Sequence, residues 1–452
     1  MALDSAIQWE IRSTGASGNG GGFKSGATGT DRSQSDTAQV AIDGATITCL
    51  VHSTTTQLNI TGYTVIDGDV GNIVQNVSGT ATTGFYEITA VDTGNNRWTV
   101  DRSAGTDTQT FVGAMGGALD HPGRISTVVV DENTVWIKGG VSYLPLDTNA
   151  YVLNTAVAVG NGKTITWYGY TGSRAKATGT DRPTFDANGE TNALVVDSIG
   201  NIFHNIIFSG AAGTGVAFAS TTGFVMVNCR CTANGTDGAG GSGGGGRWIE
   251  CEWDTNSDAG FNVGSSSTVR CYYGYSHDNT AEGFQGVNGS VFVNNIADSN
   301  GAGGWTGTHY DLINCVAYGN TGASSDGVFF NINSASPCQI INTISKDNGR
   351  NGFSRTNASA APLGYFNYNL YHGNGTAGLN NITAGANDST ADPSFTNAGA
   401  GDFTYSSSSS PCVGTGLVQT FSSGVTGDYN WNMGVDQGDH GSGGGTSVII
   451  AF

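Results

Sequence analysis

The sequence has few basic residues and few charges of either sign. Lys and Arg number 17 against 36 Asp and Glu, charged residues are only 12% of the 452, and the net charge is −19. Nucleic acids and anionic membranes bind proteins through basic surfaces. We therefore expect no nucleic-acid partner and no membrane partner. Plain solubility accounts for the acidity equally well.

Signals for metal binding, export and membrane insertion are also missing. The eight cysteines form no CxxC pair and no His/Cys zinc spacing, so we expect no metal site and no cofactor. The N-terminal MALDSAIQWEIRS lacks the regions of a secretory signal, and no apolar run reaches membrane-spanning length. We expect the histidines of the repeats to be turn or surface residues: His204, His277, His309 and His372.

Glycine is abundant, with 72 residues, about twice its usual share. It does not follow the strict period of collagen. Gly, Asn and β-branched residues disfavour helix interiors, while hydrophobic residues at 37% still supply a core. The composition therefore predicts an all-β protein with many turns.

A repeat with a period of roughly 22 residues, a length typical of solenoid proteins, begins near position 201. Cys229, Cys251, Tyr273 and Asn295 recur at this constant step. The period, with short alternating strands and Asn/Gly corners, predicts a β-solenoid whose coils stack about 4.8 Å apart with equivalent residues superposed. Most anchors are followed five residues later by Asn, and an aromatic residue then follows Gly: Asn234, Asn256, Asn300, Asn320 and Asn348, then Phe261, Phe284, Trp305 and Phe353.

The segment RWIECEWDTNSDAGF carries three carboxylates on alternate positions: Glu250, Glu252 and Asp254. If Cys251 and Trp253 point inward, these carboxylates face outward. Same-face residues of a strand sit roughly 7 Å apart, within the range of an inverting glycosidase pair. The three residues are therefore the catalytic candidates if the protein is an enzyme.

The surroundings of the carboxylates favour a solvated face instead. Arg230, one coil earlier, would lie beside Glu252 and keep it ionised, whereas a general acid needs a raised pKa. Trp248 and Tyr272 are expected on the same outer face. They are the candidates for binding a glycan, because aromatic rings offer flat apolar surfaces.

Three parts are expected along the chain. Residues 1–124 do not fit the repeat, and they combine a Gly/Ser-rich extended arm with a compact antiparallel β module that could dock on a partner. Residues 125–385 form the parallel solenoid. Residues 386–452 close the last coil's edge and end in the apolar SVIIAF, which either adds a strand to a neighbouring subunit or tucks against its own coil.

Several segments resemble the right-handed parallel β-helix proteins of the pectin-lyase-like superfamily, over roughly residues 125–437. They are TVWIKGGVSYL, KTITWYGYTGSRAKATGTDRPTFDA, rungs such as NCVAYGN, and DPSFTNAGAGDFTYSSSSSPCVGTG followed by MGVDQ. The resemblance implies the fold, but this fold hosts lyases, hydrolases, adhesins and inert spikes. No catalytic residue of the enzymatic members can be carried over by position.

The N-terminal pattern QWEIRSTGASGNGGGF…GTDRSQSDTAQ is similar to the start of β-helix proteins often encoded by tailed bacteriophages. Those proteins serve as tail spikes, fibres or capsid decorations. The resemblance implies a place on the virion surface, outside cells. It also implies docking on other capsid or tail proteins through the N-terminal module, the C-terminal tail or both.

Three functions remain open at this point. The favoured one is a non-enzymatic virion-associated structural protein of a tailed phage, with host-surface polysaccharide as a further contact. The alternative is a tailspike or secreted polysaccharide-degrading enzyme that uses the outer-face carboxylates. The third is glycan binding without cleavage, as in adhesins.

Overall fold

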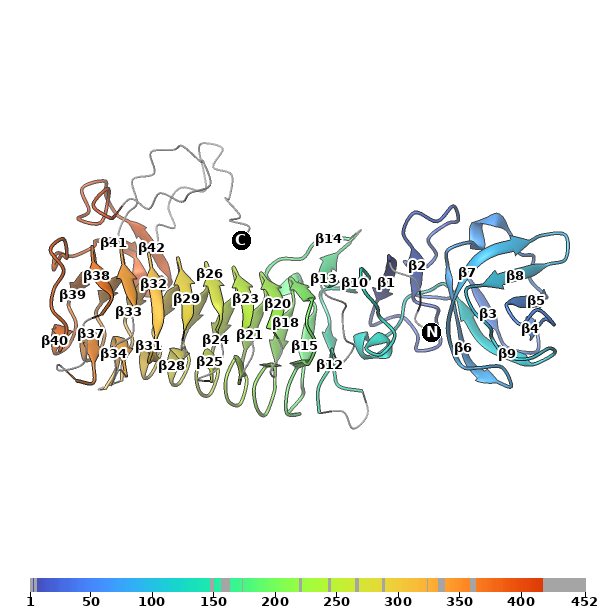
Figure 1. Ribbon diagram of the computed structural model, residues 1–452, viewed down its shortest axis with the longest axis horizontal. Coiled ribbons are helices and arrows are strands. Elements are labelled where there is room, and N and C mark those ends of the chain that lie inside the picture. Colours follow the sequence, from blue (N-terminus) through green and yellow to red (C-terminus); the bar gives the residue numbers. More distant parts are fainter. Residues whose placement is uncertain are drawn as a thin grey trace. The chain divides into compact units, whose positions relative to one another are not determined.

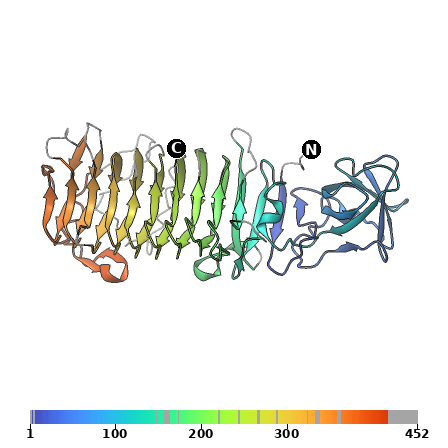
Figure 2. The same ribbon diagram turned by 90° about the horizontal axis from the view of Figure 1, so that it is seen from below.

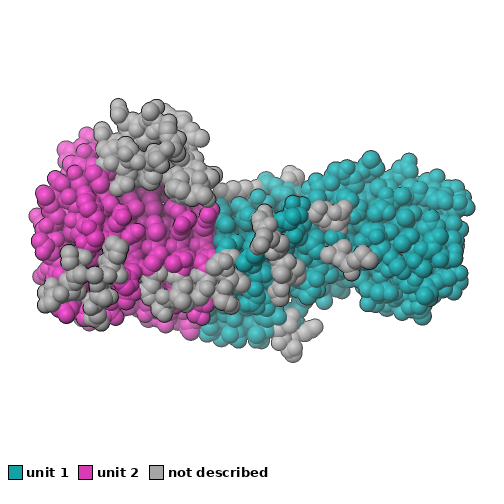
Figure 3. Space-filling view, in the orientation of Figure 1, with its two compact units in different colours: residues 1–230 teal, residues 231–452 magenta. Residues whose placement is uncertain are grey.

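The computed structural model divides the chain into two compact units, residues 1–230 (unit 1) and 231–452 (unit 2) (Figure 3). In its described part, no helix has the length and apolarity needed to cross a membrane. The helical segments are short 3-10 turns: η1 (Asp67–Asp69), η2 (Pro122–Ile125), η3 (Gly179–Asp181) and η4 (Ala398–Ala400). The structure describes residues 3, 6–146, 150–155, 163–172, 174–218, 222–242, 245–264, 268–286, 289–322, 324–331, 338–357 and 363–417. The predicted tail SVIIAF lies outside them.

Unit 1 contains the predicted antiparallel module (Figure 1). Its strands follow the order β3-β9-β4-β5-β8-β7-β6, and β9 also pairs with β6, so the sheet closes on itself. Buried side chains such as Trp98 and Phe111 fill its interior. The strands are β3 (Val40–Ile42), β4 (Thr48–Val51), β5 (Gln57–Thr61), β6 (Ile73–Gly79), β7 (Gly84–Asp92), β8 (Arg97–Val100) and β9 (Thr110–Met115).

The other strands of unit 1 form parallel coils, and each regular coil contributes one strand to each of three sheets. Sheet 1 of this unit holds β1 (Ile7–Ile11), β2 (Gly22–Lys24), β10 (Thr134–Lys138), β13 (Ile165–Thr171), β14 (Ala175–Lys176), β17 (Asn201–His204) and β20 (Thr222–Val227). Sheet 2 holds β11 (Ser142–Tyr143), β15 (Thr184–Asp186) and β18 (Ile207–Ser209), and sheet 3 holds β12 (Leu153–Asn154), β16 (Leu194–Val196) and β19 (Val216–Phe218).

The N-terminal lead-in is not the extended arm expected from its composition. Strand β1 pairs in parallel with β10, and β2 pairs antiparallel with β1. Trp9 is fully buried, and its Nε1 donates to Asn133 Oδ1 at 3.0 Å. The apolar residues of QWEI therefore begin the solenoid core, and the glycines after them let the chain pass close to neighbouring backbone.

Unit 2 repeats the three-sheet coil, and Figures 1 and 2 show its strands side by side in successive coils. Sheet 1 holds β23 (Gly245–Ile249), β26 (Arg270–Tyr272), β29 (Ser290–Val293), β32 (Tyr310–Ile313), β35 (Gln339–Ile341) and β38 (Tyr365–Asn367). Sheet 2 holds β24 (Glu252–Asp254), β27 (Tyr275–His277), β30 (Ile296–Asp298), β33 (Val316–Tyr318), β36 (Ile344–Lys346) and β39 (Leu370–His372), after β21 (Arg230–Thr232) at the unit boundary. Sheet 3 holds β22 (Ala239–Gly241), β25 (Phe261–Val263), β28 (Glu282–Gln285), β31 (Gly303–Gly307), β34 (Asp326–Phe330), β37 (Asn351–Arg355) and β40 (Ala377–Asn380).

The residues that define the predicted repeat stack inside unit 2. Phe261, Phe284 and Trp305 are paired in register along sheet 3, and all three are fully buried. The rings of Phe284 and Trp305 lie 5.1 Å apart at 10°. The prediction of a solenoid with superposed aromatic positions is confirmed.

The predicted Asn positions form a buried amide ladder. Each side-chain Nδ2 donates to Oδ1 of the next Asn, at 2.7 to 3.1 Å. The same Oδ1 atoms accept the backbone N–H of the preceding Asn. Every rung is thus satisfied by its neighbours. The ladder runs through the buried Asn234, Asn256, Asn279, Asn300, Asn320 and Asn348 and ends at the half-buried Asn374.

The predicted inward and outward directions of the side chains are wrong at the end of the sheet 1 strand, just before the corner that leads to sheet 2. Trp248, expected on the outer face, is fully buried, and the next residue, Ile249, is half-buried. Glu250 takes a left-handed conformation (φ 54°) at the corner. A single left-handed residue bends the chain sharply, so the alternation of inward and outward side chains restarts after it.

The predicted anchor at Tyr273 is also wrong, by one residue. Strand β24 pairs with β27 with Glu252 beside Tyr275, so Gly274 and not Tyr273 lies next to Cys251. Tyr273 takes the left-handed corner (φ 56°) and is 54% exposed. The step from Glu252 to Tyr275 is therefore one residue longer than the predicted step, and the fixed repeat slips at this coil.

The closing segment does more than cover the last coil. Ser389 pairs with Leu370 at the last strand of sheet 2. The chain then runs back over the outer face of sheet 2, where Phe403 and Cys412 pack on Ile296 and Ile344. Its hairpin is formed by β41 (Phe395–Asn397) and β42 (Asp402–Tyr405).

Replacing Asn279 with Ala should destabilise the solenoid strongly. Asn256 Nδ2 would lose one of its two acceptors (2.9 Å), the Asn256 backbone N–H would lose the same oxygen (3.1 Å), and the Trp253 carbonyl would lose its side-chain donor (3.1 Å). Each buried polar group without a partner costs about 1–3 kcal/mol, so we expect a loss of about 3 kcal/mol, measured as a lower urea midpoint. Asn380→Ala, an exposed site in β40, is the control. Equal midpoints for both variants would contradict the stabilising role of the ladder.

Candidate functional site

A row of stacked rings crosses the outer face of sheet 1 in unit 1. Parallel register places Trp136 of β10 beside Tyr168 of β13, and Tyr168 beside His204 of β17. Val227 of β20 continues the row. Trp167 and Phe203, which directly precede Tyr168 and His204 on their strands, point into the core. Because side chains alternate along a strand, Tyr168 and His204 point outward. The coil geometry therefore holds one ring per coil at the same outer position.

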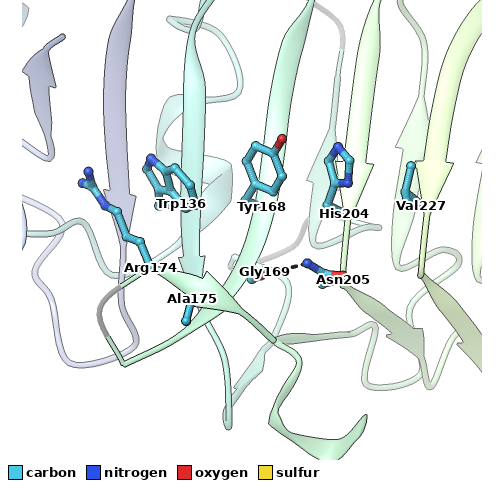
Figure 4. A pocket seen from close by; sticks show the side chains of 8 residues that line it. All are labelled: Trp136, Tyr168, Gly169, Arg174, Ala175, His204, Asn205 and Val227. Atoms are coloured by element: carbon cyan, nitrogen blue, oxygen red, sulfur yellow. Dashed lines mark hydrogen bonds between the residues drawn. The ribbon is translucent and has the colours of Figure 1, made fainter. Parts of the chain in front are cut away.

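The rings lie nearly parallel and close together. The Trp136 and Tyr168 ring centroids are 5.0 Å apart at 19°, and those of Tyr168 and His204 are 4.4 Å apart at 16°. Both faces of Tyr168 are therefore covered by its neighbours. A ligand at this row would meet the outer edges of the rings, where Figure 4 shows the Tyr168 hydroxyl and the His204 nitrogens.

Arg174 closes one end of the row. It follows β13 in a left-handed conformation (φ 54°), and its guanidinium lies 5.3 Å from the centre of the Trp136 ring. Arg174 Nη2 and Nε donate to Glu10 Oε2 at 3.0 and 3.1 Å, and Asp31 is 3.5 Å away. The position of Arg174 therefore depends on the N-terminal strand.

Glu10 is a fully buried carboxylate with several donors. Arg12 Nε donates to Glu10 Oε1 at 2.9 Å, and the Tyr170 hydroxyl donates to the same oxygen. Burial, and the nearby Glu10 carboxylate, raise the pKa of Tyr170 well above its usual value. Tyr170 therefore stays protonated and donates to Glu10 over the physiological range.

Arg174 and the row of Trp136, Tyr168, His204 and Val227 line a pocket of about 330 Å³ (Figure 4). Its volume is at the lower end of the roughly 300–1,000 Å³ of small-ligand sites. Its wall also includes Asn205 at the sheet corner, whose Nδ2 donates to the Gly169 carbonyl at 3.4 Å. Trp136 Nε1 is buried with no hydrogen-bond partner among the described residues, although a buried indole N–H usually has one. The pocket offers apolar edges with polar atoms at their ends.

Sequence reasoning missed this row. The sequence separations between Trp136 and Tyr168 and between Tyr168 and His204 are unequal. Both are longer than the separation between equivalent residues of the later coils. A search at the constant step of those coils therefore does not align the three residues. His204 was expected to be a turn or surface residue. The available signal was the apolar alternation of TVWIKGG, TITWYGY and NIFHN, where an aromatic side chain occupies one outward position in each strand.

The predicted catalytic candidates separate in the structure. Glu250 occupies the exposed corner before sheet 2, whereas Glu252 and Asp254 lie on the outer face of β24. Asp254 is not solvated, since only 2% of it is exposed. The two carboxylates lie beside His277 of the next coil.

The two predicted glycan-binding residues do not form a platform. Trp248 is fully buried and its ring packs 5.5 Å from that of Trp253 in the core. Tyr272 is half-buried on the outer face of β26. The expectation for Trp248 failed because of the left-handed corner described above.

A second acidic group lies at the start of sheet 3 in unit 2, formed by Asp237, Asp258 and Glu282. Burial and the neighbouring Asp258 carboxylate raise the pKa of Asp237 to about 6. Burial also raises the pKa of Glu282. Asp237 Oδ1 accepts from the backbone N–H of Ala259 at 3.3 Å and its Oδ2 accepts from Asn262 Nδ2 at 3.2 Å. These contacts do not offset the cost of burying the charge.

The known proteins add information about the fold. No protein-family model and no curated protein matches the chain. Among solved structures, the pectate lyase Pel9A shares 15% identity and a TM-score of 0.50, over 69% of this chain and 89% of that chain. The chain folds as a parallel β-helix. Identity at this level shows the fold alone.

Two further solved structures are less similar. An alginate lyase from Paenibacillus sp. str. FPU-7 shares 11% identity and a TM-score of 0.38, over 58% of this chain and 96% of that chain. A rhamnogalacturonan lyase shares 14% identity and a TM-score of 0.36, over 62% of this chain and 86% of that chain.

Asp237→Asn should stabilise the β-helix at neutral pH. The carboxyl titrates near 3.9 when unfolded and at about 6 when folded, so the folded state binds the proton more tightly. Its contribution to stability is therefore lost as the pH rises from about 4 to about 6. We expect the variant to melt at a higher temperature than the original chain at pH 7.5, with a smaller difference at pH 4.5.

Asp43→Asn is the control in the same melting experiment, and its melting temperature should change in the opposite direction. Backbone N–H groups of Ala45, Ile47 and Thr46 lower the pKa of Asp43 to about 2, so its ionised form stabilises the fold. This variant should melt at a lower temperature at pH 7.5. A loss of stability in Asp237→Asn at pH 7.5 would mean that the charged form of Asp237 is required.

Proposed function

We propose that this β-helix protein binds a neutral glycan in the unit 1 pocket and does not cleave it. The observation that carries the proposal is the row of Trp136, Tyr168 and His204 at one outer position of three consecutive coils. Sugars combine apolar C–H surface with hydroxyls. The row offers the matching combination, since ring edges are apolar and the Tyr168 hydroxyl can exchange hydrogen bonds.

The charges around the pocket favour a neutral ligand. Arg174 is the cation of the pocket, and Glu10 and Asp31 already lie within 3.5 Å of it. A uronic acid or sulfate would have to compete with both carboxylates for the guanidinium. The net charge of −19 also repels polyanions over long range.

The composition of the pocket favours binding over cleavage. Among the described residues that line it, none is Asp or Glu, and Glu10 reaches it only through Arg174. Glycoside hydrolysis needs two carboxyl groups that flank the bond. The predicted alternative of polysaccharide cleavage would use Glu250, Glu252 and Asp254 of unit 2, outside this pocket, where the buried Trp248 offers no exposed aromatic platform.

The location on a virion is a further part of this proposal. It is supported by the resemblance of QWEIRSTGASGNGGGF to the start of tailed-phage β-helix proteins. The N-terminal module or the C-terminal tail would hold the chain on capsid or tail proteins, and the pocket would contact host-surface polysaccharide. Mass spectrometry of purified virions should detect the full chain. Its absence would contradict the location and leave glycan binding untouched.

Tyr168→Phe and Trp136→Ala should weaken glycan binding. The first removes only the hydroxyl at the ring edge, and the second removes one ring of the row. Isothermal titration with a panel of neutral and uronate-containing oligosaccharides should show binding to a neutral member, weakened by at least tenfold in Trp136→Ala and by several-fold in Tyr168→Phe. A reducing-sugar assay of the same mixtures should detect no new reducing ends, because the glycan is not cleaved.

Tyr365→Ala is the matched control, because Tyr365 is a 39% exposed aromatic residue in unit 2. Its binding should equal that of the original chain. Binding unchanged in both pocket variants would contradict the site. Release of shorter saccharides would contradict binding without cleavage.

A further inference from the structure

Three metal-ligating side chains converge on the outer face of sheet 2 in unit 2. Glu252 and Asp254 come from β24 and His277 from β27, the next strand. One ligand atom from each lies within 4.8 Å of the other two. The convergence follows from the register, which places Asp254 directly beside His277.

The imidazole of His277 is held on two sides. Its Nδ1 lies 2.8 Å from Asp278 Oδ2, and its ring stacks on Tyr275 with centroids 4.1 Å apart. Nε2 therefore points to Glu252, with Oε1 at 3.2 Å. Histidines that bind metals usually donate the second ring N–H to a carboxylate, which fixes the ring and makes the other nitrogen a better ligand.

The carboxylate of Asp254 is oriented by two hydroxyls. Thr232 and Thr255 donate to Asp254 Oδ2 at 2.9 and 3.1 Å. Asp254 is only 2% exposed. Its carboxylate is therefore held in a fixed orientation beside Glu252 and His277.

We propose that Glu252, Asp254 and His277 bind a divalent first-row transition metal ion such as Zn²⁺. One imidazole and two carboxylates suit this class, whereas Ca²⁺ and Mg²⁺ take oxygen ligands. Ligands about 2.1 Å from a zinc ion lie at most about 4.2 Å apart. The Glu252 side chain is 31% exposed, so it can rotate to shorten the present distances.

The ion would join two coils through their side chains. Three protein ligands leave coordination positions open, an arrangement typical of zinc sites that bind water or a substrate atom. This inference does not depend on the unit 1 pocket. The proposal departs from the sequence-based expectation that no metal site is present.

Zinc titration of the full chain after EDTA treatment and dialysis tests the site. We expect one tight site by calorimetry, a higher melting temperature with Zn²⁺, and an absorption band with Co²⁺ as a spectroscopic substitute. Glu252→Gln and His277→Asn should each weaken binding at least tenfold. Asp278→Asn should weaken binding by about tenfold or more through the imidazole, and Asn tolerates the left-handed backbone of that residue (φ 53°).

His372→Asn is the matched control. His372 lies in the same column of sheet 2, 3.9 Å from a single carboxylate, Asp392. Its loss should leave zinc affinity unchanged. The proposal is overturned if Zn²⁺ and Co²⁺ do not bind, if both Glu252→Gln and His277→Asn bind with full affinity, or if Ca²⁺ binds as tightly as Zn²⁺.

Discussion

The register of the coils in unit 2 depends on the buried amide ladder. Each ladder Asn donates to the next and accepts from the previous one, with Asn279, Asn300 and Asn320 as its central rungs. A slip of one residue between two coils would leave an amide donor and acceptor unpaired in the core, which is costly. Hydrophobic contacts alone do not set register so strictly, since Phe261 could pack against several neighbours. The directional hydrogen bonds therefore decide which residues superpose.

Once the register is set, every outward position becomes a column of side chains one coil apart. In unit 1 a column holds Trp136, Tyr168 and His204. In unit 2 another places Asp254 beside His277. Similar or complementary side chains therefore lie next to each other wherever successive coils have them at equivalent outward positions. The same geometry accounts for the apolar column of Ile296, Val316 and Ile344, which the C-terminal segment covers.

The sequence predicted the repeat better than the direction of its side chains. The Asn and Gly-aromatic positions identified the coil, because their chemistry requires a fixed place in it. Sidedness failed at Trp248 because Glu250, unlike Asn294 or Asn314 at equivalent corners, gives no hint of a left-handed conformation. The aromatic row was missed because loops of unequal length separate its members. The contact between Asp254 and His277 required knowing that this coil is one residue longer than the predicted step.

The pocket in unit 1 also depends on a part of the chain outside the repeat. Arg174 is held by Glu10, and Glu10 lies in register with Trp136 because β1 docks on β10. The first strand thus supplies both the edge of the sheet and the charge that orients the guanidinium. A solenoid needs a cover for its first coil, since an open edge would pair with other chains. In this protein the segment that meets that requirement also holds Arg174, so it positions one residue of the pocket wall.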